Sequence, residues 1–548
     1  MQARAARIVA SPMNDPLTTS SPPPVARPGS PFRHRAFTVI WIATVVSNIG
    51  GWMYSVASGW LMTSLDPNAF IVSMVQAANS LPMFLFAIPA GALADIVNQR
   101  RFLIVGESTI TIVSAAFAAL VWLRLITPVS LLLFSFIVSV GSAMTAPAWQ
   151  SVVAKLVPKP DLPSAVAANS VGINVSRAIG PALGGVIVGA LGIAAPFWLD
   201  AFSNVGVIAA LIWWRAPARS ASALPPEPFG GAIRTGLRYA RYNSHLRATL
   251  IRTIAFFLFG SAYWALLPLV ARTQIAGGPA LYGVLLGAVG ASAVGGAFIL
   301  RRLRERLGAD SLVAAASLGT ALATALYALA RHPAIAIVAS FIAGASWIAA
   351  VASLNVSAQV ALPEWVRGRG LAMYVTVMFG ALTLGSAIWG QLAVVAGLPA
   401  ALLLAAAGAA IGIPVTWRWK LQTGVNVDFS PSMHWPDPVT THAIEPDRGP
   451  VLVTVEYRID PKNRTAFLHA LGQNSRERRR DGAYDWGIFE DPADEGRFIE
   501  TFLTDSWLEH LRQHRRVTKS DRISEQAVRR FQIGDGPKTT HLLSAQRD

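Results

Sequence analysis

Four ionisable side chains lie inside long apolar stretches of this 548-residue sequence, and they are Glu107, Arg177, Asp200 and Arg252. A charge in such a stretch is costly unless it is paired or faces water, so each is a candidate for binding a proton or a polar ligand. Arg177 lies roughly 18 Å into its stretch and Asp200 roughly 9 Å into the next one from the opposite end, which places them at a similar level. We expect these two either to act in proton coupling or substrate contact or to form a structural ion pair. Glu107 and Arg252 lie closer to the ends, where snorkelling toward the membrane surface is the favoured interpretation.

A second charged pattern closes the apolar run from Phe70 to Ala94, with the spacing Gly-x-Leu-x-Asp-x-x-x-x-Arg-Arg. Two arginines directly after an apolar run of spanning length stop that run at a membrane surface. An acid beside them can pair with basic residues or face a helix N-terminus. The spacing therefore predicts a conformational latch, rather than a substrate ligand, made of Gly91, Asp95, Arg100 and Arg101.

The composition is that of a membrane protein. Hydrophobic residues make up 53% of the chain and charged residues 14%, and the mean hydropathy of +0.45 lies outside the usual range of soluble domains. The chain has no cysteine, which excludes disulfides, thiol catalysis and cysteine-bound metals. No phosphate-binding Walker pattern occurs, so an ATP-driven pump is not expected.

Twelve apolar runs are long enough to cross a bilayer by the rule of about 20 residues per crossing. They lie at 37–61, 71–94, 102–123, 129–148, 165–190, 194–214, 249–271, 281–300, 311–330, 334–356, 368–392 and 396–417. With a cytoplasmic N-terminus, the short loops on that side hold sixteen Lys and Arg residues, and the others hold only Arg124, Arg272 and Arg331. The positive-inside rule then places both termini in the cytoplasm, and it accounts for the net charge of +16 without nucleic acid.

The apolar region consists of two similar halves. A shift of 205 positions aligns Gly180 with Gly385, while Leu300 stands where the first half has Asp95. Parallel halves of this kind enclose a cavity near the midplane, and alternating access is a rocking of one half against the other. The predicted divisions are a disordered tail (1–31), a first six-helix half (32–215), a cytoplasmic central loop (216–247), a second six-helix half (248–420), a linker (421–448) and a soluble α+β domain (449–548).

These patterns resemble a known family. The spacing from Gly91 to Arg101 is similar to the signature between the second and third helices of major facilitator transporters. The stretches VSNIGGWMYSVASGWLM (46–62), NSLPMFLFAIPAGALADIVNQRR (79–101) and SRAIGPALGG (176–185) look like the transmembrane secretion effector branch, near the enterobactin exporters. The resemblance, which covers residues 32 to 420, implies an all-α polytopic fold of twelve helices. It also implies export of a siderophore, drug or other metabolite across the inner membrane by proton antiport.

The fifth apolar run contains Gly180, Pro181, Gly184 and Gly185. Proline removes a backbone hydrogen bond and kinks a helix, and glycine lets a neighbouring helix approach closely. The group resembles the antiporter motif of exporting facilitators. The alternative is a packing kink with no bearing on the direction of transport, since small residues are common in membrane helices.

Polar uncharged residues of the runs can line a cavity or bridge helices, and bridging is the commoner role. They are Asn48, Gln76, Asn79, Asn169, Asn174, Asn204, Asn355 and Gln359. The central loop ends in the basic stretch 232–247, which is expected to be amphipathic and to lie on the inner membrane surface.

From Gly449 onward the sequence predicts a soluble domain. Strands are expected at 451–459, 484–490, 497–503 and 539–543, and helices at 461–480, 506–514 and 524–531. The order β-α-β-β-α-β predicts a ferredoxin-like sandwich. This domain resembles the dimeric α/β-barrel domains of small antibiotic-synthesis monooxygenases, which implies homodimer formation through it.

That resemblance supplies an alternative function, a membrane-tethered ligand sensor or monooxygenase-like enzyme whose activity resides in the C-terminal domain. Its candidate pocket residues are His469, Tyr484, Trp486, Trp507, His510 and His514. These residues show no metal-ligand spacing with acids, and His510 and His514 on a charged helix are best interpreted as a solvated face. We therefore expect no catalytic residue, no metal and no cofactor. The expected partners are a small-molecule cargo, protons and the lipid bilayer.

Overall fold

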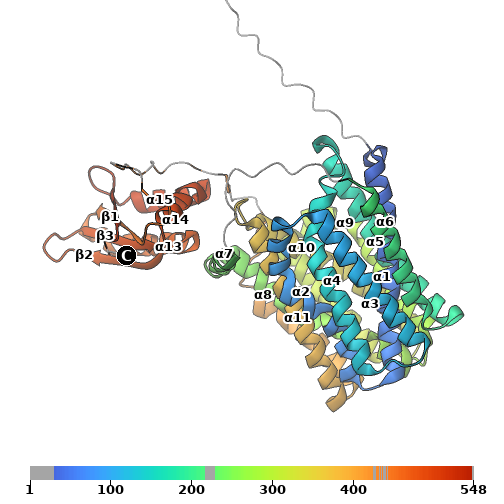
Figure 1. Cartoon of the computed structure of the whole chain (residues 1–548). Coiled ribbons are helices and arrows are strands. Elements are labelled where there is room, and N and C mark those ends of the chain that lie inside the picture. The colour runs from blue at the N-terminus through green and yellow to red at the C-terminus, as the bar shows by residue number, and fades with distance from the viewer. Residues whose placement is uncertain are drawn as a thin grey trace, which may run out of the picture.

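The computed structural model describes residues 30–215 and 229–545, apart from 424–427, 431, 433–434, 436–437, 439, 441 and 443. The side chains of 92, 94–96 and 229–235 are also outside the described part. The predicted disordered tail (1–31) therefore lies almost wholly outside the described residues. Figure 1 shows a large helical bundle, a smaller domain of strands and helices, and helix α7 between them.

Eleven helices among the described residues are long and apolar enough to span a membrane. The first half contains α1 (Arg35–Leu65), α2 (Ala69–Ile96), α3 (Gln99–Trp122), α4 (Pro128–Val153), α5 (Leu162–Leu191) and α6 (Ala195–Trp213). The second half contains α8 (Ser244–Leu269), which continues as a short π-helical turn (Val270–Gln274), then α9 (Pro279–Leu329), α10 (Pro333–Val360), α11 (Arg367–Ala396) and α12 (Leu398–Thr416).

Polar side chains fix where several of these helices begin. Asn68, Asn98 and Asn243 each accept a hydrogen bond from a backbone N–H in the first turn of α2, α3 and α8. Thr127 and Ser130 form a capping box at the start of α4. Such caps satisfy N–H groups that have no partner within the helix. The turns between apolar runs are therefore encoded locally.

Helix α9 contains two crossings. It has 51 residues, and Gly308 near its middle has a φ of 75°, a left-handed conformation that interrupts the helix and that glycine adopts without strain. The predicted runs at 281–300 and 311–330 fall on either side of this break. With α9 counted as two spans, the eleven candidate spans give the twelve that the sequence predicts, and the all-α polytopic fold is confirmed.

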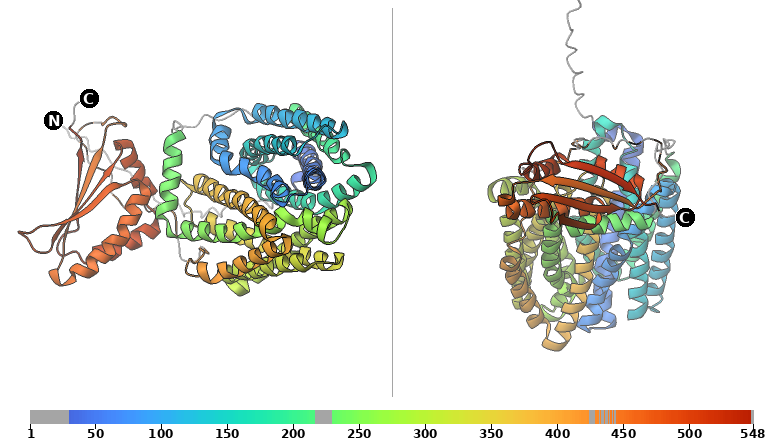
Figure 2. Two further views of the ribbon diagram at one scale, coloured as in Figure 1. Left: turned by 90° about the horizontal axis from the view of Figure 1, so that it is seen from below. Right: turned by 90° about the vertical axis from the view of Figure 1, so that its left-hand side faces the viewer.

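The two halves meet along two helix pairs, α2 with α11 and α5 with α9. In the second pair, a Cβ on Gly185 would lie 2.8 Å from the Cα of Gly283, and a Cβ on Gly290 would lie 2.6 Å from the Cα of Ala178. Both distances are shorter than a van der Waals contact, so a larger residue would force the helices apart. Figure 2 shows the two halves side by side in the view from below.

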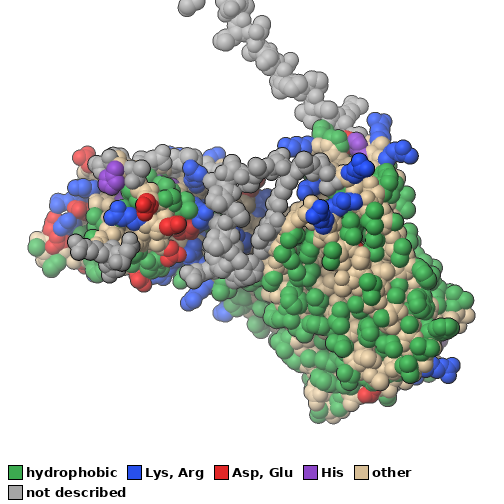
Figure 3. All heavy atoms as spheres, in the orientation of Figure 1, with side chains coloured by type: hydrophobic (Ala, Val, Ile, Leu, Met, Phe, Trp, Pro, Cys, Tyr) green, Lys and Arg blue, Asp and Glu red, His purple; other side chains and the backbone are tan. Residues whose placement is uncertain are grey.

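The outer surface of the bundle is apolar. Ile112 is 69% exposed, Phe298 is 83% exposed and Val395 is 74% exposed. Figure 3 shows hydrophobic side chains over the middle of the bundle and Lys and Arg side chains gathered mainly at its upper end. A belt of this kind suits contact with lipid tails rather than with water.

The C-terminal part, here called the tail domain (residues 428–545), contains a four-stranded sheet in the order β2-β3-β1-β4, with every neighbouring pair antiparallel. Its elements are β1 (Val451–Arg458), α13 (Arg464–Asp481), β2 (Tyr484–Glu490), β3 (Arg497–Thr504), α14 (Trp507–Arg516), α15 (Lys519–Arg529) and β4 (Lys538–Leu543). This is the predicted β-α-β-β-α-β order, and α15 before the last strand corresponds to the further helix expected at 524–531. The predicted α+β domain is confirmed.

The two faces of the tail sheet differ. Residues of β1 alternate between buried and half-buried positions, and the buried set packs with α13 through Phe467 and Leu471. On the other face, Leu452 is paired with both Leu503 and Leu542 in the register of the sheet. Figure 2 shows the helices of the tail domain toward α7 and the sheet on the side turned away. One face of the sheet is thus without a covering helix.

The tail domain docks on α7 (Phe229–Tyr242) and on the turn between α10 and α11. The guanidinium of Arg480 lies 5.7 Å from the ring centroid of Tyr239, and that of Arg516 lies 4.5 Å from the ring of Trp365. Arg238 and Glu509 form an ion pair of 3.6 Å. These contacts join the tail domain to the second half of the bundle.

Part of the segment predicted as a linker (421–448) packs on the tail domain. The backbone N–H of Ser432 donates to the carbonyl of Val517 at 3.0 Å, and that of Lys519 donates to the carbonyl of Ser430 at 3.0 Å. Trp435 donates from its indole N–H to Glu525 at 2.9 Å. These bonds tie 428–435 to α14 and α15.

Candidate functional site

A cavity of about 810 Å³ lies between the two halves of the bundle. Residues of α1 to α6 line one side, and residues of α8 to α11 line the other. Glu107, Arg177 and Asp200 all contribute to the lining, although they come from three different helices. The volume lies within the range of pockets that hold small organic molecules. The structure thus brings together the three ionisable residues proposed from the sequence.

Asp200 lies on α6 and is 4% exposed. The hydroxyl of Ser114 on α3 donates a hydrogen bond to its Oδ2 at 3.1 Å. Gly50 on α1 packs directly against it, since a Cβ there would lie 3.0 Å from the Asp200 Cα and 3.3 Å from Oδ1. The carboxylate is therefore enclosed on one side by α1 and held by one hydroxyl on the other.

Arg177 lies on α5 with its guanidinium 5.7 Å from the ring centroid of Trp52 on α1. Within the described part of the chain, its Nε has no hydrogen-bond partner and the side chain forms no ion pair. The pair of Arg177 with Asp200 that their similar depth suggests is therefore not formed in this structure. The reason is that α1 packs along both α5 and α6, which contact each other far less than either contacts α1, and depth along a helix cannot reveal this packing.

The structure contradicts the expectation that Glu107 and Arg252 snorkel toward the membrane surface. Glu107 is 7% exposed, lines the cavity and accepts a hydrogen bond from the indole N–H of Trp149 at 2.8 Å. Arg252 is 3% exposed and forms an ion pair of 2.9 Å with Asp310, with Trp417 stacked on it at 5.7 Å. Each side chain finds a partner inside the protein, so neither extends to the surface.

The first half supplies the other polar groups of the cavity. Five of the eight polar candidates line it, namely Asn48, Gln76, Asn79, Asn169 and Asn204. The side-chain oxygen of Asn204 accepts from Ser47 at 2.5 Å and that of Asn79 accepts from Ser139 at 3.3 Å. Each bridges two helices while also facing the cavity.

The second half supplies a largely apolar wall. It contributes Trp264, Ala265, Pro268, Tyr282, Leu286, Trp347, Val351, Met378, Phe379 and Leu382. Aromatic and aliphatic side chains bind the apolar part of a ligand by burial, while a few polar groups set its orientation. The cavity therefore suits an amphipathic molecule that is held between unlike walls.

Contacts between the halves close the end of the cavity that is remote from the tail domain. The rings of Trp60 and Tyr282 stack with centroids 6.3 Å apart. Arg272 donates to the hydroxyls of Thr63 at 3.0 Å and Ser64 at 2.5 Å. At the other end the lining reaches the ends of α1 and α4, at Phe37 and Val153 among others. Among the described residues, these contacts between the halves lie at one end of the cavity.

A model of the transmembrane secretion effector family matches residues 26–548. The chain belongs to this family of major facilitator transporters. It is a multi-pass membrane transporter and not an enzyme.

Curated relatives of this transporter are transporters as well. The multidrug efflux pump Tap of Mycolicibacterium fortuitum is 25% identical over 380 residues, which are 67% of this chain and 91% of the pump. The staphyloferrin A transporter of Staphylococcus aureus is 24% identical over 242 residues, which are 43% of this chain and 60% of that transporter. Macrolide efflux protein A of Streptococcus pyogenes is 24% identical over 251 residues, again 60% of its length. The matches to the last two proteins span less than two thirds of their length.

Solved structures support the fold. A POT family transporter in complex with a thioalcohol-conjugated peptide matches with a TM-score of 0.57 at 14% identity, covering 70% of this chain and 96% of that one. A bacterial homologue of the lysosomal transporter Spinster, in an inward-facing and unoccupied conformation, matches with a TM-score of 0.54 at 15% identity and covers 72% of this chain. At these identities the likeness concerns the fold alone.

The predicted latch of the transporter is described in part. Arg100 donates from Nε and Nη2 to the carbonyls of Leu211 and Ile212 at 2.8 and 2.7 Å. It therefore caps the C-terminal end of α6 within the first half. Arg101 is exposed, Gly91 lies in the last turns of α2, and the side chain of Asp95 lies outside the described residues.

The glycine and proline group of α5 faces two neighbours. A Cβ on Gly180 would lie 2.5 Å from the Cβ of Trp52, and a Cβ on Gly184 would lie 2.9 Å from the Cα of Met53, both on α1. Gly185 faces the second half, as described above, and the carbonyl of Pro181 lies against Gly283 there. The group thus places α5 in close contact with α1 on one side and with α9 on the other.

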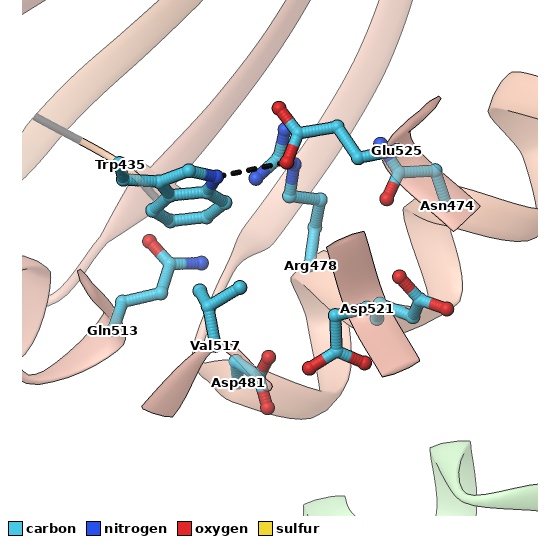
Figure 4. Close-up of a pocket in the computed structure, with 9 residues that line it drawn as sticks. Trp435, Asn474, Arg478, Asp481, Gln513, Val517, Asp521 and Glu525 are labelled. Carbon is cyan, nitrogen blue, oxygen red and sulfur yellow. Dashed lines mark hydrogen bonds between the residues drawn. The ribbon is translucent and has the colours of Figure 1, made fainter. Parts of the chain in front are cut away.

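Figure 4 shows a pocket of the tail domain lined by Trp435, Asn474, Glu477, Arg478, Asp481, Gln513, Val517, Asp521 and Glu525. Its volume of about 10 Å³ is room for roughly one water molecule. Arg480 binds Asp481 and Asp521 at 2.7 and 2.9 Å nearby. Burial, with the charge of Asp521 second, raises the pKa of Glu477 to about 8. This pocket is a packed charged core rather than a site for an organic substrate.

The histidines of the tail domain lie in different places. His469 is exposed on α13, whereas His510 on α14 is only 1% exposed. The solvated-face interpretation is therefore wrong for His510. Burial, followed by the neighbouring His514 and His541, lowers the pKa of His510 to about 3. His541 escaped the sequence reasoning because only the pairing of β4 with β1 brings it under α14, with its ring 4.7 Å from that of His510.

Proposed function

We propose that this transporter exports a small molecule across the cell inner membrane by proton antiport and alternating access. One observation carries the proposal, namely that Asp200, Glu107 and Arg177 share one cavity between the halves without an ion pair between Arg177 and Asp200. Carboxylates at membrane depth that lack a cationic partner are suited to taking up protons. Movement that brings Arg177 to Asp200 would release the proton.

The distribution of basic residues favours a cytoplasmic location for both termini and for the tail domain. In that orientation the cavity extends toward the cytoplasm and is sealed on the outer side by Trp60, Tyr282 and Arg272. An exporter loads its cargo in this state. Outward opening then requires the bonds from Arg272 to α1 to break while the cytoplasmic ends of the halves close.

The cargo that fits the cavity is amphipathic. Its polar or anionic part would face Arg177 and the asparagines of the first half, and its apolar part would lie against Trp264, Trp347 and Phe379. Relatives named for transport of staphyloferrin A and for efflux of multiple drugs and macrolides are consistent with a siderophore, a drug or another metabolite as cargo.

The test begins with a deletion strain, in which lost secretion of a metabolite or increased drug susceptibility identifies the cargo. The purified transporter is then reconstituted in liposomes with that cargo, and a proton gradient is imposed in either direction. We expect cargo to move against its own gradient and to reverse when the proton gradient is reversed. Cargo flux that is independent of the proton gradient would contradict antiport. The absence of any cargo flux would contradict the transport function.

For the tail domain we propose self-association through the uncovered face of its sheet. An apolar row crosses that face, made of Leu542, Leu452, Leu503 and Tyr484 in register, of which Leu542 is 50% exposed. Because the chain has no cysteine, a single Thr501→Cys substitution on this face gives a clean cross-linking probe. A disulfide dimer in membranes is expected, whereas Arg522→Cys on the helix side should stay monomeric. Equal cross-linking of both would contradict a specific face.

A further inference from the structure

Three histidines of the tail domain converge from two elements. His510 and His514 are four residues apart on α14, so they lie on the same side of the helix. His541 lies on β4 opposite Val453, on the face of the sheet that the helices cover. The ring of His510 has its centroid 4.7 Å from that of His514 and 4.7 Å from that of His541.

The donor atoms of the three rings are close enough to share one ion. One nitrogen from each ring lies within 4.8 Å of the other two. In a tetrahedral site with metal–nitrogen bonds of about 2.0–2.1 Å, ligand nitrogens are about 3.3 Å apart, so each must move by roughly 1 Å. A shift of this size is within the range of side-chain rotation.

The environment of His510 calls for a ligand. It is 1% exposed, and among the described residues neither of its ring nitrogens has a partner with hydrogen-bond geometry, although the side chain of Gln513 lies nearby. A buried polar group left without a partner is rare and costly. Arg478, a cation that acts electrostatically on His510, forms an ion pair with Glu500 at 3.6 Å. A bound ion would satisfy one nitrogen of His510 without meeting an uncompensated cation.

We propose that His510, His514 and His541 form a binding site for a divalent transition-metal ion of the zinc type. Three imidazoles without a thiolate or carboxylate suit Zn²⁺, Co²⁺, Ni²⁺ or Cu²⁺, whereas Mg²⁺ and Ca²⁺ prefer oxygen ligands. A water molecule would complete the four positions around the ion. The proposal is independent of the cargo and of the coupling ion.

The location of the site connects it to the transporter. Helix α14 carries two of the ligands, and it also carries Glu509, which pairs with Arg238 of α7, and Arg516, which stacks on Trp365. A metal ion that joins α14 to β4 would fix the helix that docks on the second half. The site is thus placed to report metal availability to the bundle.

The test uses the full-length transporter in detergent, purified through a tag without histidine and freed of metal with a chelator. Titration with Zn²⁺ is followed by calorimetry, for the unmodified protein, for His541→Gln and for His469→Gln as a control from an exposed position of the same domain. We expect one ion per chain, binding weakened at least about 100-fold in His541→Gln, since loss of an outer-shell group alone costs roughly 10–100-fold, and unchanged binding in His469→Gln. Equal Zn²⁺ binding by all three proteins, or none by any, would overturn the site.

A second measurement does not depend on a variant that folds. Co²⁺ bound by three imidazoles and water in a four-coordinate site absorbs strongly in the visible range, and the aqueous ion absorbs weakly. Addition of Co²⁺ to the unmodified protein should give the strong bands, and one equivalent of Zn²⁺ should remove them, while Mg²⁺ should not. If only the weak bands of the aqueous ion appeared, the proposal would be overturned, even if every variant unfolded.

Discussion

The bundle and the tail domain both bury charged side chains, but they satisfy them to different degrees. In the tail domain, Arg480 binds two acids at 2.7 and 2.9 Å. In the bundle, Asp200 receives one hydroxyl bond at 3.1 Å, and Arg177 has a tryptophan ring in place of a carboxylate. Fully paired buried charges hold a structure in one state, whereas incompletely paired charges can exchange partners. The comparison separates charges that stabilise the fold from charges that are available for a transport cycle.

The largest effect should come from removing the charge of Asp200. Asp200→Asn resembles the protonated acid, so efflux driven by a proton gradient should be abolished while exchange of cargo for cargo continues. Both fluxes are measured in liposomes, with Asp66→Asn, which removes a half-buried acid in the turn after α1, as control. Normal proton-driven efflux by Asp200→Asn would remove this residue from the mechanism. A loss of stability with no specific effect on coupling would mean that Asp200 stabilises the fold and takes no part in coupling.

The opposite result is expected in the tail domain. Asp521→Ala removes one partner of Arg480 and the capping bonds to Thr518. Leaving a buried charge with fewer partners should destabilise the tail domain by about 3–5 kcal/mol. Hydrogen exchange of peptides from α13 and α15 in the full-length protein measures the loss, and Asp535→Ala at an exposed position is the control. Protection that is unchanged in Asp521→Ala would show that this network contributes little.

The predicted latch should have an intermediate effect. Asp95→Asn removes an anion that can stabilise the outward-facing state by roughly 1–2 kcal/mol, so transport should slow while cargo affinity stays nearly intact. Transport rate and cargo binding are measured side by side. The matched control is Glu305→Gln, because Glu305 is a 62% exposed acid on α9 in the second half. Affinity lost in proportion to transport would contradict a latch.

The sequence predicted the elements better than their contacts. Hydrophobic run length, polar caps and the break at Gly308 are local properties, so the membrane spans and the order of the tail domain could be predicted from the sequence. The similar depth of Asp200 and Arg177 along their segments also indicated that the two lie at one level of the bundle, and both line the cavity. Depth does not define which way a side chain points, and the absence of a pair between Arg177 and Asp200 depends on how α1, α5 and α6 pack together.

The contacts of two further sites could not be predicted from the sequence either. Glu107 lies near the end of its run, but Trp149 of the next helix provides a hydrogen bond that keeps it inside. The histidine cluster depends on the pairing of Val453 with His541. These residues lie on β1 and β4, which are separated by most of the tail domain in sequence. A long-range register of this kind leaves no local signal.

The smallest expected effect concerns Glu477, which tests whether the charged core of the tail domain is satisfied throughout. Burial raises its pKa to about 8 in the folded state, so the fold favours the protonated acid. The stability this provides is complete below the ordinary pKa of a glutamate and is lost as the pH rises toward 8. Glu477→Gln cannot ionise, so it should stabilise the tail domain by about 1–2 kcal/mol at pH 8 and have little effect at pH 4.5. Hydrogen exchange at both pH values, corrected for intrinsic rates, measures the difference, with the exposed Glu495→Gln as control. A variant that is less stable than the unmodified protein at pH 8 would mean that the ionised Glu477 carboxylate stabilises the domain as a partner of Arg480. The charges of this core would then be fully paired, as the comparison with the bundle assumes.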